Sequence, residues 1–245
     1  MNTLYLECNS GICGDMVVAA LVDLGMDHNI LSDAIVSMPV PGVEVLISRV
    51  KKQGLDVCDF RVVMDAGLYS EKPTHRHRGL KEVTDIIKQT RITDKAKNTA
   101  LKAFEILGRA EAKVHGTTLD EIHFHEVGSI ASIIDVISAA VCLDYLQIQE
   151  VIIPVLYDGQ GITRCEHGVL PIPVPAVASI VAEQGLKMHI TKYHEELVTP
   201  TGAAIAAAIR TSEELPEQFS IKKTGIGAGK RDYESPGILR AMLIE

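Results

Sequence analysis

Two strand-like segments that follow each other directly restrict the fold of this chain more than any other feature. Residues 43–50 and 57–64 both alternate between apolar and polar side chains, and Gly54 lies in the short connection between them. Strands joined by so few residues pair as an antiparallel hairpin, whereas parallel strands need a long crossover connection. We therefore favour an α+β fold, in which helices cover a mixed β-sheet, over a strictly parallel sheet.

Other segments show helical or strand-like periodicity. An apolar stripe of Ile130, Ile133, Ile134, Ile137 and Val141 predicts a core helix within residues 127–146. Further helices are expected at residues 16–24, 30–37, 80–89, 94–114 and 201–209, and from about residue 175. Further strands are expected at residues 3–8, 122–125, 150–156, 188–191, 220–223 and 238–244. We interpret the 245 residues as one domain, with an internal hinge expected in the polar, basic loop 67–79.

Charge and composition argue against several classes of function. The formal net charge is −8, aromatic residues make up 4%, and there is no tryptophan. Nucleic acid and anionic membranes are therefore not expected as partners, because no basic stripe and no aromatic stacking platform is present. The longest apolar stretch, residues 130–142, contains Asp135 and is shorter than the roughly 18 residues that a membrane span needs.

Cysteine usage and the first residues favour a cytoplasmic protein. The five cysteines are an odd number and include no C-x-x-C pair, which suits a reducing compartment. Residues 1–8 have neither the basic region nor the long apolar core of a signal peptide.

Two pairs of histidines, His75–His77 and His123–His125, are the strongest chemical signal. Side chains two residues apart on an extended segment point to the same side, so each pair can present two imidazoles to one metal ion. Glu126 follows the second pair directly, and Phe124 is expected to anchor that segment in the core. The alternative interpretation is two pairs of solvated surface imidazoles.

Cys165 and His167 form a second candidate metal site. A thiol and an imidazole two residues apart on an extended segment suit nickel, copper or zinc. The alternative is a small buried thiol beside a solvated histidine. For His115, in the last turn before Gly116, we expect an interaction with the helix dipole rather than metal binding.

Three glycine-containing segments are candidates for binding a phosphate. Residues 10–15 join a predicted strand to a helix, and residues 199–202 begin another helix; free backbone N–H groups and the helix dipole favour anions at such places. The glycine-rich residues 225–229 supply flexible backbone next to two cations. The alternative is three ordinary turns, with Asp15 capping its helix. The site residues predicted here are Gly11, Gly14, Asp15, Thr199, Thr201, Gly202, Lys230 and Arg231.

Motifs in these regions follow one another in a characteristic order along nearly the whole chain. They are residues 4–8, 10–16, 75–78, 110–116, 122–128, 167–176, 196–203 and 225–232. In sequence and order they resemble the LarC family of nickel insertion proteins. The family inserts nickel into a pyridinium mononucleotide that carries two thiocarboxylates, which forms the nickel-pincer nucleotide cofactor of lactate racemase and its relatives.

The resemblance implies a CTP-dependent cyclometallation that needs Mg²⁺ or Mn²⁺. On this basis we expect the primary nickel site at His123, His125 and Glu126. Cys165, His167, His75 and His77 are expected to deliver the metal, and the three glycine-containing segments to hold the nucleotide phosphate. The candidates for the base that accepts the ring proton are Glu126 and Asp135.

Three departures from the family pattern affect these expectations. Ala131 stands where an aspartate that would pair with Asp135 is usual, and Cys13 stands where serine is common. The chain ends at Glu245, whereas the family continues into a C-terminal region associated with CTP binding. We therefore expect that region as a further domain or a separate chain, with a recipient racemase and a second copy of this chain as further partners.

Two other functions compete with nickel insertion. A metallochaperone or storage module would bind nickel weakly, whether or not the mononucleotide is present. A metal-dependent hydrolase would use H-x-H ligands to activate water and would turn over simple esters or phosphoesters with Zn²⁺ or Mn²⁺.

Overall fold

A six-stranded mixed sheet forms the centre of the protein, in the strand order β2-β3-β11-β12-β1-β6. The computed structural model describes residues 2–65, 67–68, 78–124, 127–165, 167–232 and 234–245. The strands of this sheet are β1 (Asn2–Glu7), β2 (Val43–Lys52), β3 (Leu55–Met64), β6 (Ile148–Ile152), β11 (Ile221–Ala228) and β12 (Ile238–Ile244). Most of the predicted hinge loop lies outside the described residues.

The pairing within this sheet confirms the mixed arrangement. β2 and β3 form the predicted antiparallel hairpin, and its two-residue turn, Gln53–Gly54, has positive φ at both positions (48° and 85°). Such a turn matches the twist of the paired strands. β3 runs parallel to β11 and β1 runs parallel to β6, whereas β12 is antiparallel to both β11 and β1.

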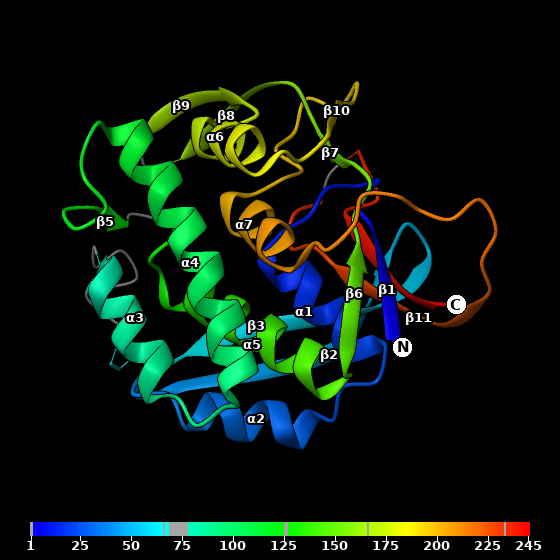
Figure 1. Cartoon of the computed structure of the whole chain (residues 1–245), viewed down its shortest axis with the longest axis horizontal. Coiled ribbons are helices and arrows are strands. Elements are labelled where there is room, and N and C mark those ends of the chain that lie inside the picture. The colour runs from blue at the N-terminus through cyan, green and yellow to red at the C-terminus, as the bar shows by residue number, and fades with distance from the viewer. Residues whose placement is uncertain (1, 66, 69–77, 125–126, 166, 233) are drawn as a thin grey trace.

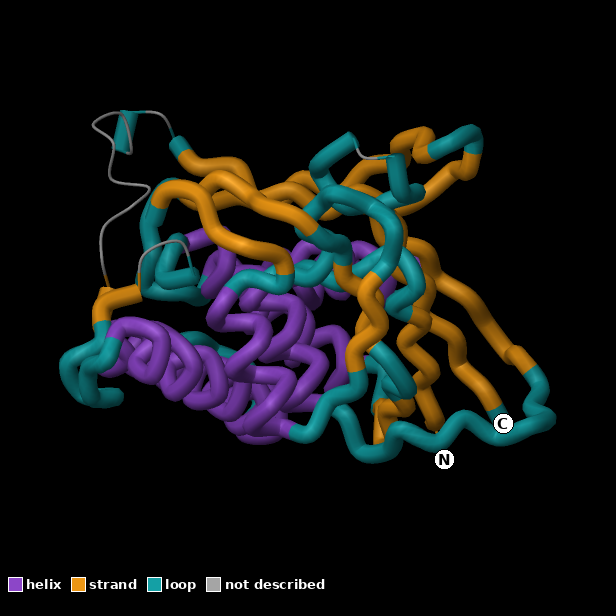
Figure 2. Tube along the Cα trace, turned by 90° about the horizontal axis from the view of Figure 1, so that it is seen from above, coloured by secondary structure: helices purple, strands orange, loops and turns teal. Residues whose placement is uncertain are grey.

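The helices gather beside the sheet, as Figures 1 and 2 show. They are α1 (Gly14–Asp23), α2 (His28–Val36), α3 (Leu80–Gln89), α4 (Asp94–His115), α5 (Ile130–Tyr145), α6 (Pro175–Gln184) and α7 (Pro200–Ile209). α1 packs directly on β3, β11 and β12, and α5 packs on α1. α4 lies farther from the sheet, against α5, α6 and α7. Among the described residues, no helix combines the length and apolarity needed to cross a membrane.

Strands with a two-residue period place different side chains on the two faces of the sheet. Leu239 and Ala241 of β12 belong to the large core beneath the helices, whereas Met242 and Ile244 lie in a small second cluster. The ring of Phe219 packs edge-on against Tyr5 there, with ring centroids 6.3 Å apart. The segment between α7 and β11 thus covers part of the other face.

Hydroxyl caps define where several helices begin. The Thr93 hydroxyl accepts from the Ala96 N–H at 3.1 Å, and the Ser129 hydroxyl accepts from the Ser132 N–H at 3.2 Å. A cap satisfies one of the N–H groups that have no partner within the helix. The helix predicted for residues 127–146 therefore begins at Ile130, directly after Ser129, and ends at Tyr145.

Two predicted elements differ from the structure. The strand expected at residues 150–156 is two strands, β6 and β7 (Leu156–Asp158), because the N–H of Ile153 bonds to Ser212 O at 3.0 Å between them. The glycines after residue 223 were expected in flexible backbone, but Gly225 and Gly227 lie within β11. A Cβ on Gly227 would lie 2.2 Å from Met16 O, so this glycine lets α1 approach the sheet.

Three two-stranded sheets lie outside the central sheet. β4 (Arg78–Gly79) pairs with β5 (His123–Phe124), and β8 (Gly161–Cys165) pairs with β9 (Gly168–Ile172). β7 runs parallel to β10 (Met188–Ile190). β5 carries His123, and the turn between β8 and β9 carries His167.

We predict that Gly227→Ala lowers the free energy of unfolding by about 1–3 kcal/mol, because the added methyl group forces α1 away from β11. Urea denaturation measures this change. Gly79→Ala is the matched control: Gly79 has a φ of −76°, and its Cβ would be 3.5 Å from the nearest neighbouring atom, Ile122 O. Equal stability of the two variants would contradict the close helix–sheet contact.

Candidate functional site

Two cavities lie side by side and share the side chain of Glu196. The first, which we call the imidazole cavity, is lined by Glu111, Val114, His115, Val127, Thr163, Cys165, His167, Leu170, Val174, Pro175, Ala176, Glu196 and Pro200. The second, the Lys230 cavity, is lined by Ser10, Cys13, Asp15, Met16, Glu196, Leu197, Thr199, Gly229, Lys230, Arg231 and Gly237.

Glu196 connects the two cavities through its carboxylate. Its Oε2 accepts from Thr163 Oγ1 at 3.3 Å in the imidazole cavity and from Arg231 Nη1 at 3.1 Å in the Lys230 cavity. The side chain of Glu196 is only 10% exposed, whereas that of Arg231 is 56% exposed. The carboxylate of Glu196 is thereby held between the two cavities, with the exposed guanidinium of Arg231 paired to it.

The imidazole cavity brings together histidines from two distant segments. His115 comes from the last turn of α4, and His167 comes from the turn between β8 and β9. Their ring centroids are 5.0 Å apart, and the ring planes are inclined by 41°. The Oε2 atom of the buried Glu111 lies 3.4 Å from Nε2 of His115. Cys165 lines the same cavity, so imidazole, thiol and carboxylate donors all face one space.

Sequence reasoning found part of this group and missed the rest. Cys165 and His167, which it paired as metal ligands, line one cavity, and their metal binding stays a prediction; it assigned His115 to the helix dipole and did not consider Glu111. Gly116 ends α4 in the left-handed conformation with a φ of 64°, and the His115 ring lies beside His167. The i, i+4 spacing of Glu111 and His115 on α4 was the one available signal.

The other predicted metal ligands are only partly described. Phe124 anchors β5 in the core as expected, with its ring centroid 6.0 Å from that of Phe104, and His123 is exposed. His123 does not line the imidazole cavity. The predicted ligands His75, His77, His125 and Glu126 lie outside the described residues. Within the described part of the chain, no group of three or more His, Cys, Asp or Glu side chains is arranged to hold a metal ion.

The loops predicted to bind phosphate meet at the Lys230 cavity. The N–H of Ile12 donates to Leu197 O at 2.9 Å, and the N–H of Thr199 donates to Ile12 O at 3.1 Å, so α1 and α7 begin side by side. The Thr199 hydroxyl caps α7 by accepting from the Gly202 N–H at 3.1 Å. Of the predicted residues, Asp15, Thr199, Lys230 and Arg231 line this cavity.

The other predicted residues of these loops, Gly11, Gly14, Thr201 and Gly202, are packed against neighbouring parts of the protein. A Cβ on Gly11, whose φ is 87°, would lie 2.0 Å from Leu197 O, and a Cβ on Gly202 would lie 2.2 Å from Ile12 O. Gly14 packs on Asp135, and Thr201 is buried. None of these four residues lines the Lys230 cavity. Their close packing fixes the positions of the loops that do. Asp15 does not cap α1, because the N-cap position is Cys13.

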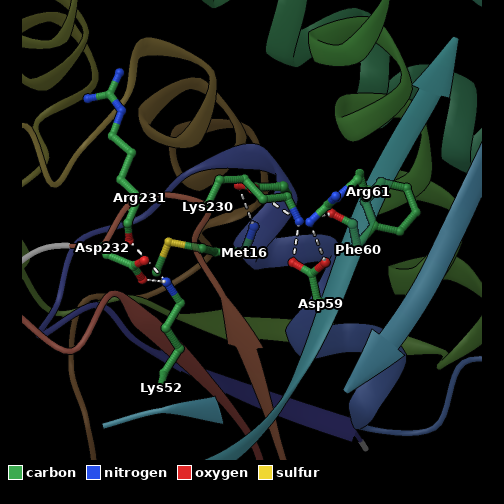
Figure 3. A network of polar contacts seen from close by, with 9 residues as sticks. Met16, Lys52, Asp59, Phe60, Arg61, Lys230, Arg231 and Asp232 are labelled. Atoms are coloured by element: carbon green, nitrogen blue, oxygen red, sulfur yellow. Dashed lines mark hydrogen bonds and ion pairs between the residues drawn. The ribbon is translucent and has the colours of Figure 1, made fainter. Parts of the chain in front are cut away.

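Lys230 is fixed by a buried carboxylate, as Figure 3 shows. Its ammonium donates to Asp59 and, at 2.5 Å, to Phe60 O, and it lies 3.9 Å from the Asp15 carboxylate. Asp59 is almost fully buried, and Arg61 lies 3.8 Å from it. Hydrogen bonds of this kind hold the cation in one place at the wall of the cavity.

Below the start of α1, two carboxyl groups lie close to each other. Burial raises the pKa of Asp15, and burial together with the charge of Asp15 raises the pKa of Asp135 well above its usual range. Burial likewise raises the pKa of the neighbouring Cys13 thiol. Asp135, a predicted proton acceptor, lines neither cavity and packs beneath Gly14.

These shifts predict a pH-dependent stability. Because the pKa of Asp135 is higher in the folded than in the unfolded chain, the folded state binds more protons, and stability falls as pH rises from about 4 through the folded pKa. A difference of one in pKa corresponds to about 1.4 kcal/mol. We expect that raising the pH from 5 to 7.5 lowers the free energy of unfolding less in Asp135→Asn than in the wild type, as measured by urea denaturation.

Asp120→Asn, which removes an exposed carboxyl group, is the matched control. Its free energy of unfolding should change between pH 5 and pH 7.5 by the same amount as that of the wild type. An Asp135→Asn variant that behaves like Asp120→Asn would contradict the buried carboxyl pair.

Comparison with known proteins identifies relatives along the entire chain. The sequence profile described as Nickel insertion protein matches residues 4–245. A pyridinium-3,5-bisthiocarboxylic acid mononucleotide nickel insertion protein of Alkaliphilus metalliredigens is 49% identical over 255 residues, which cover 100% of this chain and 61% of that protein. A protein of the same name from Acetivibrio thermocellus is 34% identical over 245 residues, covering 99% of this chain and 60% of that protein.

The chain thus spans about 60% of the length of the curated relatives that it matches. No solved structure matches it. Because the family profile covers nearly all of its residues, the chain belongs to the nickel insertion protein family.

Proposed function

We propose that this chain binds nickel and a pyridinium mononucleotide bearing two thiocarboxylates, and that it takes part in inserting the nickel into that mononucleotide. The observation that carries the proposal is the junction of the two cavities at Glu196. One cavity offers imidazole and thiol donors, and the other offers cations. A ligand with a metal-binding end and a phosphate end matches this division, and the names of the relatives describe such a ligand.

The phosphate end is proposed to bind in the Lys230 cavity. Lys230 stands fixed at its wall, and the exposed Arg231 can form charge-assisted hydrogen bonds with phosphate oxygens. The N-terminus of α1 begins at the same cavity, where its dipole favours an anion.

The pyridinium ring is proposed to lie in the imidazole cavity with its sulfur atoms towards the metal. Nickel accepts both imidazole nitrogen and sulfur ligands, so His167 and Cys165 can hold it while thiocarboxylate sulfurs replace them. Holding the metal and the ring in adjoining positions turns a bimolecular encounter into a local ligand exchange, which is a large source of rate.

A proton must leave the ring as the nickel–carbon bond forms. Glu196 is proposed to accept it, because its carboxylate lies between the phosphate end and the metal end of the site. Glu126 stays a prediction as a proton acceptor, whereas the position of Asp135 outside both cavities argues against a direct role.

His75 and His77 are proposed to deliver nickel, and the assignment of His123, His125 and Glu126 as its first ligands stays a prediction. Arg78, which directly follows His77, pairs with Phe124, which directly precedes His125. The pairing of β4 with β5 thus places Arg78 and Gly79 beside Phe124 and His123. CTP with Mg²⁺ or Mn²⁺ is proposed to act in the part of the relatives that this chain does not span. The recipient racemase, a second copy of this chain and a cytoplasmic location stay predictions.

Calorimetric titration with the bisthiocarboxylate mononucleotide tests the proposal. We expect the wild type to bind it, and Arg231→Gln to bind it about 10–100-fold more weakly, because one charged hydrogen bond to phosphate is lost. Arg109→Gln is the matched control, since Arg109 is also exposed and paired with a glutamate, Glu105, but lies on α4 outside both cavities.

Nickel binding in the same experiment separates the competing functions. Nickel affinity that rises in the presence of the mononucleotide supports insertion. Nickel binding that is unaffected by the mononucleotide, together with no binding of the mononucleotide itself, contradicts the proposal and favours a metallochaperone.

A further inference from the structure

We propose that His115 and His167 together bind a divalent transition metal ion in the imidazole cavity, and that Glu111 positions the His115 ring for this role. That the bound ion is the nickel to be inserted rests on the proposed function. The existence of the metal site is independent of that function, because it is inferred from the arrangement of three side chains.

The spacing of the two rings fits a shared metal ion. With metal–nitrogen bonds of about 2.1 Å, two imidazoles bound at angles of roughly 90–109° have ring centroids about 4.5–5.2 Å apart. The centroids of His115 and His167 are 5.0 Å apart. Their planes are inclined by 41°, which matches neither face-to-face stacking nor an edge-on contact. The separation of the two rings is thus one that a shared metal ion allows.

Glu111 has the position of a group that orients a metal-binding histidine. It lies one helical turn before His115 on α4, with 3.4 Å between its Oε2 and Nε2 of His115. Metal-bound histidines commonly direct their second ring nitrogen at a carboxylate, which fixes the tautomer and makes the ligating nitrogen more basic. Val114, Val127 and Leu170 line the same cavity, and Glu111 itself is buried, so the carboxylate is held in place behind the more exposed His115 ring.

The donor set selects the class of metal. Imidazole nitrogens, with the Cys165 thiol on the same cavity wall, favour nickel, zinc or copper over magnesium and calcium, which prefer oxygen ligands. Two histidines leave further coordination positions of the metal open towards the cavity. Open positions are typical of sites that act on a substrate, whereas structural sites are closed by four protein ligands.

The test uses the full chain without an affinity tag, and it measures Ni²⁺ binding by calorimetry in the absence of the mononucleotide. We expect His115→Ala and His167→Ala each to weaken binding about 10–100-fold. His189→Ala should bind as the wild type does, because His189 lies on β10 against Tyr157 and outside the imidazole cavity. His115→Asn, which keeps a polar side chain of similar size, should lose binding to the same extent as His115→Ala.

Co²⁺ serves as a spectroscopic probe of the same site. Its visible absorption should appear on binding to the wild type and to His189→Ala, and should be lost in His115→Ala and His167→Ala. For Glu111 the readout is the ¹⁵N spectrum of the His115 ring. Glu111→Gln should change the tautomer population of that ring and weaken Ni²⁺ binding about 10-fold, whereas Glu105→Gln on the exposed side of α4 should do neither.

The outcomes separate this inference from the proposed function. Unchanged Ni²⁺ affinity in both His115→Ala and His115→Asn, or no Ni²⁺ binding by the wild type, would overturn the inference. Binding of the mononucleotide to His115→Ala with normal affinity would show at the same time that the proposed substrate site is intact. Loss of Ni²⁺ binding in the histidine variants supports the inference even if the mononucleotide fails to bind to any form of the protein.

Discussion

Close backbone contact at glycines is the constraint on which the arrangement of the candidate site depends. Gly225 and Gly227 let α1 lie directly on β11, with the Asp23 carboxylate accepting from the Ile226 N–H at 2.8 Å. Gly11 and Gly202 let the two loops before α1 and α7 pass within hydrogen-bonding distance of each other. Because no larger residue fits at these points, the ends of two helices, β11 and Lys230 meet in one place.

The charge pattern around this meeting point divides the site into two halves. Asp59 fixes Lys230 in the second cavity, and Glu196 stands between that cavity and the imidazoles of the first. The overall net charge of −8 gave no indication of a site for an anion. A few fixed groups with short-range hydrogen bonds decide local binding, because salt screens the more distant charges.

Local elements were predictable where a signal lies within a few residues. The β2–β3 hairpin and the stop at Gly116 both depend on neighbours along the chain. The predicted strand boundaries were wrong where a contact with a distant part of the chain determines them. Residues 150–156 divide into two strands because Ile153 bonds to Ser212, and the glycines of β11 are strand residues because α1 packs on them.

The sequence by itself determined the mixed sheet, most helix boundaries, the family, and the residue types available for metal and phosphate binding. Only the tertiary structure decided that His115 stands beside His167, that Glu111 lies behind it, and that Glu196 connects the two cavities. The reason is physical: periodicity and spacing describe which side chains share one helix or strand. The approach of two segments distant in the chain depends instead on how the helices pack on the sheet and on one another.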